Sequence, residues 1–180
     1  MKKVLALLAM TIVPLTAAAH GPSPQKVEKS IVIKAEPAKV WAIVKDFGNL
    51  HKWLPPVATT KVETKKDESG ETATYRLLTL KGGGTVYEKL RSIDDADMKI
   101  KYEIIEGVLP VADYNAYMTV KAGPGAGEAT VTWVARFYRV YKLNQPIPAG
   151  QDDKSAVDAI NGVFDAGLPG LKKVAETGKL

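Results

Sequence analysis

Six strand-like segments follow one another along the middle of the chain, and only short turns separate them. Each segment alternates apolar and polar residues, as a strand with one buried face does. The breaks contain glycine, aspartate or proline, as in Gly82–Gly84 and Gly123–Gly127, and such residues favour turns. Strands on such short connections pair as antiparallel neighbours, so the pattern predicts an antiparallel meander. The six segments are Val57–Lys66, Glu71–Leu80, Thr85–Ile93, Met98–Glu106, Ala112–Lys121 and Ala129–Val140.

A further strand and two short helices come before the meander. Val27–Lys34 has strand-like alternation, and Pro37 follows it at a place suited to the first position of a helix. Gly48 is expected to end this helix. Asn49–Trp53 then predicts a second short helical turn before two prolines.

The last segment predicts one long amphipathic helix. Asp152 or Asp153 can cap its N-terminus. Pro169 lies inside the pattern and is expected to kink or split the helix. Its apolar residues recur with a spacing of three or four, at Val157, Ile160, Phe164, Leu168, Leu171 and Val174.

Composition excludes several classes of protein. The chain of 180 residues contains no cysteine, which excludes disulfides, thiol catalysis and cysteine-bound metals. Its charges are interspersed without a long basic run, so nucleic-acid binding has little support. A chain of this length is expected to form one domain with an adequate core of its own.

The N-terminus has the three parts of a signal peptide. Lys2 and Lys3 precede an apolar run, Val4–Leu15, and Ala17–Ala19 supplies a cleavage motif. The run is too short to span a bilayer, although an uncleaved anchor or a buried helix are the alternatives. We therefore expect a signal peptide over residues 1–19, a tail over 20–26 and one domain over 27–180. The mature protein would be periplasmic, with no membrane span after cleavage and a formal net charge of +3 instead of +5.

Three stretches carry a resemblance to a known superfamily. They read KAEPAKVWAIVKDFGNLHKWLPPV, GGGTVYEKLRSIDDADMKIKYEIIEGVLPVADYNAYMTV and ATVTWVARF. Together they resemble the START-like or Bet v 1-like superfamily, also called the SRPBCC or polyketide cyclase/dehydrase-type group, over Val27–Ala175. The resemblance implies an α+β helix-grip fold. In that fold a curved seven-stranded antiparallel sheet wraps around a long C-terminal helix, with two short helices after the first strand and a cavity between sheet and helix.

Within that superfamily, the leader, the AHGPSPQKVEKS stretch and the HKW segment are similar to methanol-oxidation accessory proteins of the MxaD type. The resemblance implies a periplasmic, non-enzymatic helper of quinoprotein methanol dehydrogenase and its cytochrome c. Two alternatives stay open: a periplasmic carrier of a hydrophobic or aromatic ligand, and a small cavity enzyme of cyclase/dehydratase type. Lysines that could contact an acidic partner, or simply form solvated strand faces, are Lys61, Lys65, Lys66, Lys99 and Lys101.

Strand alternation assigns residues to the cavity. Apolar sets should face the helix, so Tyr75 and Leu77 are predicted to point inward and Arg76 outward. Aromatic residues with a polar tip suit a small-molecule pocket, although simple core packing is the alternative. The predicted cavity-lining residues are Trp53, Tyr75, Leu77, Glu88, Leu90, Tyr102, Ile104, Tyr114, Met118, Trp133, Phe137, Phe164 and Leu168.

Glu88 is the most informative of these residues. It shares a strand face with Val86 and Leu90, so it points inward if they do. A buried carboxylate must be paired or protonated. Glu88 is therefore the best candidate for a polar feature of the cavity near Tyr102 or Trp133, the alternative being a salt bridge at a strand edge.

The two histidines provide little for catalysis or metal binding. His51 could pair with Glu88 or Asp46 as an acid–base couple, or could simply be a surface residue. Cleavage after Ala19 would make His20 the new N-terminus, where an amine and an imidazole could chelate copper if His51 joined them. We expect no catalytic residue, no metal site and no cofactor.

Overall fold

The computed structural model describes residues 21–180 and contains one seven-stranded antiparallel sheet in the order β1-β7-β6-β5-β4-β3-β2. The predicted α+β helix-grip fold is confirmed. Two short helices follow the first strand, and one long helix ends the chain. The elements are β1 Gln25–Ile33, α1 Pro37–Val44, η1 Phe47–Lys52, β2 Val57–Lys66, β3 Thr72–Leu80, β4 Thr85–Asp94, β5 Lys99–Gly107, β6 Val111–Ala122, β7 Ala129–Arg139 and α2 Asp153–Thr177.

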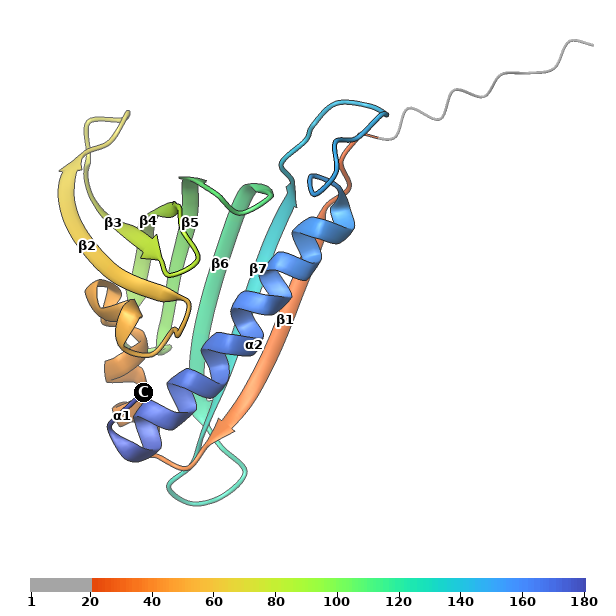
Figure 1. Ribbon diagram of the computed structural model, residues 1–180. Helices are drawn as coiled ribbons and strands as arrows, with labels where there is room; N and C mark the ends of the chain where they lie inside the picture. Colours follow the sequence, from red (N-terminus) through yellow and green to blue (C-terminus); the bar gives the residue numbers. More distant parts are fainter. Residues whose placement is uncertain (1–20) are drawn as a thin grey trace, which may run out of the picture.

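The sheet is a meander to which one further strand is added. Strands β2 to β7 pair in sequence order, and β1 returns to pair with β7 from Gln25↔Phe137 to Ile33↔Ala129. Helix α2 packs on β1 and β7, whereas β2 to β5 curve away from it (Figure 1). This uneven packing leaves room between the helix and strands β3 to β5.

Bulges contribute to the curvature. The β4–β5 register shifts twice, and the β6–β7 register shifts between Ala112 and Asn115. Asp113 within that shift has a φ of 51°, a left-handed conformation that aspartate tolerates better than most residues. Because bulges increase local bending and twist, they help the sheet curl around the helix.

Helix α2 is continuous through Pro169, so it is not split there as the sequence suggested it could be. The Asp152 carboxylate accepts a hydrogen bond from the Ser155 amide at 2.6 Å and caps the first turn. Residues on both sides of the proline, Phe164 and Leu171 among them, are fully buried in the core. We attribute the continuity to this packing, which offsets the lost backbone hydrogen bond.

Two glycines beside the proline let α2 approach the sheet closely. A Cβ atom on Gly170 would lie 2.2 Å from the carbonyl oxygen of Trp53, and one on Gly167 would lie 2.7 Å from the Trp133 ring. Both distances are too short for any side chain. These glycines therefore allow close packing of α2 against Trp133 of β7 and against the chain at Trp53.

Differences from the expected boundaries are small. Strand β1 begins at Gln25, so the end of the expected tail already pairs with β7. Helix α1 ends at Val44, and Gly48 lies inside η1. The predicted signal peptide lies outside the described residues and stays a prediction. Within residues 21–180, no helix is both long and apolar enough to cross a membrane.

Candidate ligand cavity

A cavity of about 290 Å³ lies between α2 and the curved part of the sheet. Its wall is mainly aliphatic, with a few polar and aromatic side chains from β3 to β7. Such a mixture is typical of small-molecule sites. The lining residues are Leu50, Leu54, Pro56, Val57, Arg76, Leu78, Leu80, Val86, Glu88, Tyr102, Ile104, Leu109, Tyr114, Trp133, Ala159, Ile160, Gly162 and Val163.

A buried ion pair provides the charged groups of this wall. Arg76 on β3 and Glu88 on β4 stand directly opposite each other in the strand register. The Nε of Arg76 donates to Oε2 of Glu88 at 2.5 Å, and Nη1 donates to the carbonyl oxygen of Phe47 at 3.1 Å. Arg76 is 4% exposed and Glu88 5% exposed. The pair therefore joins two strands and η1 inside the protein.

The environment acts on Glu88 in two opposite directions. Burial raises the pKa of its carboxyl group above the usual value, because a charge is poorly solvated there, while the Arg76 guanidinium favours the carboxylate and opposes this rise. The guanidinium also lies 4.0 Å from the centre of the Phe47 ring, in a cation–π contact. Removing either partner would leave an uncompensated buried charge.

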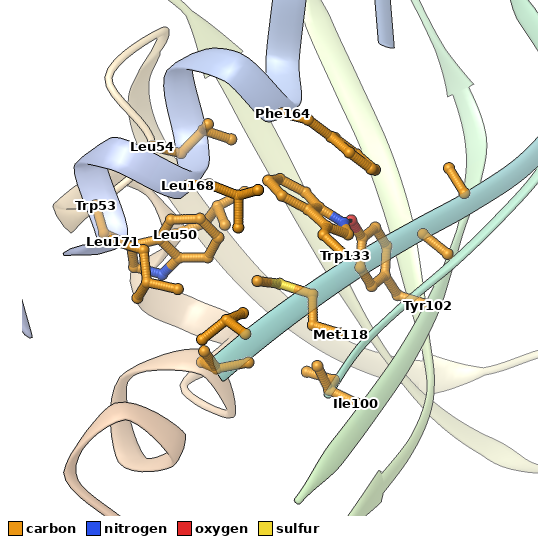
Figure 2. Packing of buried hydrophobic residues seen from close by; sticks show 14 of the residues in the cluster. Leu50, Trp53, Leu54, Ile100, Tyr102, Met118, Trp133, Phe164, Leu168 and Leu171 are labelled. Atoms are coloured by element: carbon orange, nitrogen blue, oxygen red, sulfur yellow. Dashed lines mark hydrogen bonds between the residues drawn. The ribbon is translucent and has the colours of Figure 1, made fainter. Parts of the chain in front are cut away.

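Aromatic residues form a second polar feature of the wall. The indole nitrogen of Trp133 donates to the Tyr102 hydroxyl at 2.9 Å, and the Trp133 ring stacks on Phe164 of α2 at 4.1 Å (Figure 2). Burial raises the pKa of both Tyr102 and Tyr114 above the usual value for tyrosine. Both phenols are therefore uncharged at neutral pH and can only donate or accept hydrogen bonds.

The predicted cavity residues fall into three groups. Glu88, Tyr102, Ile104, Tyr114 and Trp133 line the main cavity. Trp53 and Met118 instead border a void of about 10 Å³. The remaining inward-facing residues pack in or against the hydrophobic core, and they are Leu90, Phe137, Phe164 and Leu168.

The inward prediction for Tyr75 and Leu77 was wrong. Tyr75 stacks on Tyr87 at 5.3 Å, and Leu77 borders a groove with Lys61 and Glu63 on the outer face of the sheet. Arg76, Leu78 and Leu80 occupy the inner face instead. Both faces of β3 carry apolar residues, so alternation alone could not choose between them. The acid Glu88 was the available signal, because a buried carboxylate that is not protonated needs a cation nearby, and Arg76 on the preceding strand could supply it.

His51 takes no part in the cavity wall. It lies half-buried on η1, and its Nδ1 has no hydrogen-bond partner. Neither suggested acid is its partner: Asp46 accepts from Asn49 at 2.7 Å, and Glu88 accepts from Arg76 at 2.5 Å. His20 lies outside the described residues. Within residues 21–180, no group of three or more His, Cys, Asp or Glu residues is placed to hold a metal ion.

A curved antiparallel sheet that closes over one long helix around an internal cavity defines the START-like, helix-grip class of proteins. Residues 24–176 match the family model described as polyketide cyclase/dehydrase and lipid transport. The chain therefore belongs to that family. A search of the curated proteins finds no match.

Solved structures share the fold of this chain. The protein XoxI from Bacillus cereus is 26% identical, with a TM-score of 0.66 over 83% of this chain and 94% of that one. The ZhuI aromatase/cyclase from a Streptomyces species is 18% identical, with a TM-score of 0.64 over 85% of this chain and 94% of that one. A START superfamily protein from Mycobacterium smegmatis is 14% identical, with a TM-score of 0.57 over 83% and 98%. The last two likenesses show the fold alone.

Proposed function

We propose that this protein is a non-enzymatic binding protein that holds one small, largely apolar molecule in its cavity. The observation that carries the proposal is the aliphatic wall interrupted by a single ion pair. The volume of about 290 Å³ is close to the lower end of the range of small-molecule pockets, roughly 300–1,000 Å³. The pairing of Glu88 with Arg76 favours binding over catalysis, because a general acid or base needs a carboxyl group that is free to exchange protons.

Val86 provides a direct test, because it is buried on β4 and lines the cavity. Native mass spectrometry of gently purified protein should show a bound small molecule in the wild type and in Gly162→Ala, a change at an exposed position of α2 where an added Cβ atom meets nothing within 4 Å. Val86→Trp should lose the molecule, because the larger side chain occupies the cavity. A wild-type protein without any bound mass, or equal retention in both variants, would contradict the proposal.

We further propose that binding serves methanol oxidation in the periplasm, through contact with quinoprotein methanol dehydrogenase or its cytochrome c. The similarity of the leader and the HKW segment to MxaD-type accessory proteins supports this role, as does the likeness to XoxI. The outer face adds a physical reason. A groove of about 300 Å³ there contains Lys101, Tyr117 and Arg136, and Lys99 lies 4.4 Å from the Tyr117 ring centre.

These cations suit an acidic partner better than Lys65 and Lys66, whose side chains already have partners. Lys65 pairs with Glu63, and Lys66 donates to a backbone carbonyl oxygen. Among described residues, Lys101 and Arg136 form no ion pair. Unpaired surface cations raise the rate at which an acidic protein is encountered.

A reconstituted assay would test this role. Methanol-dependent electron transfer from the dehydrogenase to the cytochrome should accelerate when the protein is added. The double variant Lys99→Glu/Lys101→Glu should weaken the acceleration. The control Lys173→Glu, at an exposed position of α2, should not. An unchanged rate with the wild-type protein, or no retention of either redox protein in a periplasmic pull-down, would count against the accessory role.

The hypothesis of a cavity enzyme makes a different prediction. Glu88 would then be the acid or base, and Glu88→Gln would abolish turnover of a cyclisation or dehydration substrate. The binding hypothesis instead predicts that Glu88→Gln alters only which molecule is retained. Turnover by the wild-type protein that is lost in Glu88→Gln would overturn the non-enzymatic proposal.

A further inference from the structure

We propose that the Arg76–Glu88 pair makes the cavity selective for an uncharged, mainly apolar molecule with one hydroxyl group, such as a simple phenol or a short alcohol. The inference rests on the proposed binding function. It adds the chemical class of the ligand and the residues that select it.

Charge balance excludes ionised ligands. Within the cavity wall, Arg76 and Glu88 already neutralise each other, and the other titratable groups that face the cavity are Tyr102 and Tyr114. Burial keeps both phenols uncharged at neutral pH. A carboxylate or an ammonium group would therefore enter without a counter-ion of its own, and an isolated charge is costly in an apolar site.

Hydrogen-bonding capacity favours a hydroxyl group over a pure hydrocarbon. Glu88 uses Oε2 to accept from Arg76, and its Oε1 accepts no bond from residues 21–180. Arg76 uses Nε and Nη1, and its Nη2 likewise has no acceptor there. A hydroxyl group both donates and accepts, so it can bond to Oε1 and Nη2 together. A hydrocarbon would leave both positions without a partner.

Size restricts the apolar part of the ligand. A volume of about 290 Å³ suits one aromatic ring or a short alkyl chain, and it is too small for a two-chain lipid. Leu78, Val86 and Ile104 supply the aliphatic wall around that part. The expected ligand therefore has an apolar body and one uncharged polar end.

Three probes of nearly equal size test the inference: 4-ethylphenol, ethylbenzene and 4-ethylbenzoate. Titration of the full chain at neutral pH, followed by the fluorescence of the tryptophans, which include the cavity residue Trp133, should show the tightest binding for 4-ethylphenol. We expect an advantage of about tenfold or more over each of the other probes, since a buried polar site rejects analogues that leave it unpaired. Equal or tighter binding of ethylbenzene or 4-ethylbenzoate would overturn the inference but keep the binding function. Binding of none of the probes would overturn both.

Two variants assign the selectivity to the ion pair. Arg76→Met/Glu88→Leu replaces the pair by apolar residues of similar size, a change that buried pairs often tolerate. It should abolish the preference for 4-ethylphenol over ethylbenzene, while Glu88→Gln should make 4-ethylbenzoate the preferred probe. The matched control is Lys89→Met/Asp67→Asn, which removes an ion pair on the outer face of β4 and should keep the wild-type order. A preference for 4-ethylphenol that persists without Arg76 and Glu88 would contradict the assignment.

Discussion

Two ion pairs that involve neighbouring residues of β4 lie on opposite faces of the sheet. Glu88 of β4 points into the cavity and pairs with Arg76, whereas its neighbour Lys89 points outward and pairs with Asp67 at 2.8 Å. The inner pair lies in an apolar wall, where each charge depends on the other for its stabilisation. The outer pair is only partly buried, with side chains 13% and 15% exposed, and it borders an open groove from which water can solvate either charge. We therefore expect the inner ion pair to be essential for stability and the outer ion pair to be dispensable.

The largest difference in stability is expected when one member of each ion pair is removed. Glu88→Leu leaves Arg76 buried and unpaired, and we expect it to lower the free energy of unfolding by about 3–5 kcal/mol. Lys89→Met should cause a much smaller loss, because water replaces the contact. Urea denaturation of both variants measures the difference. Similar losses on the two faces would show that the inner pair is not isolated from solvent.

Two glycines of α2 compare a position packed against the rest of the protein, Gly170, with an exposed one, Gly162. Gly170→Ala should destabilise the protein by about 1–3 kcal/mol, because its Cβ would meet the Trp53 carbonyl oxygen and force the helix outward. Gly162→Ala enters open space, so it should stabilise the helix by about 0.5–1 kcal/mol. Thermal unfolding of the two variants gives the sign of each effect. A loss of stability in Gly162→Ala would show that this exposed position of α2 is not open.

The contributions of Asp67 and Glu88 to the stability of the protein should depend on pH in opposite directions. Hydrogen bonds from Lys89 and Ser69 lower the pKa of Asp67, so its stabilisation is present above its usual pKa of 3.8 and is lost as the pH falls below it. Burial raises the pKa of Glu88, so its contribution is greatest below the usual value of 4.5 and declines as the pH rises through the raised value. The stability difference between wild type and Asp67→Asn should shrink below pH 3.8. The stability difference between wild type and Glu88→Gln should grow as the pH is lowered from neutral towards 4.5. Stability differences that do not change with pH would contradict both assignments.

The smallest effect is expected at the outer aromatic cluster. The Tyr87 hydroxyl bonds to Glu63, and Lys65 lies 4.9 Å from the centres of the Tyr75 and Tyr87 rings. These polar groups lie on the solvent side of the sheet, so Tyr87→Phe should leave the unfolding midpoint and the binding of all three probes unchanged. A clear change in probe binding would show that the outer face communicates with the cavity.

Local patterns predicted most of the fold. The strand boundaries follow from alternation interrupted by glycine, proline and aspartate, and Asp152 acts as the cap that its position suggested. The place of Glu88 between Val86 and Leu90 made it a candidate for the cavity wall, which it lines in the structure. Such features depend on residues close together in the chain, so a single sequence is enough to find them.

The cavity was less predictable, because it depends on pairings across the sheet. Both faces of β3 are apolar enough to be buried, and the assignment of Tyr75 and Leu77 therefore failed. Arg76 was expected on the solvent side and proved to be the partner of Glu88. Its position becomes clear only when the β3–β4 register places the two residues opposite each other.

The sequence by itself determined the order of elements and the antiparallel meander, since both depend on local periodicity and turn chemistry, and it made Glu88 a candidate for an inward acid. Only the tertiary structure decided which face of β3 is buried, how closely α2 approaches Trp53 and Trp133, and where a space remains. Those features depend on the sheet curving away from a helix that packs on β1 and β7. The cavity and its ion pair are produced by that curvature, which no single segment encodes.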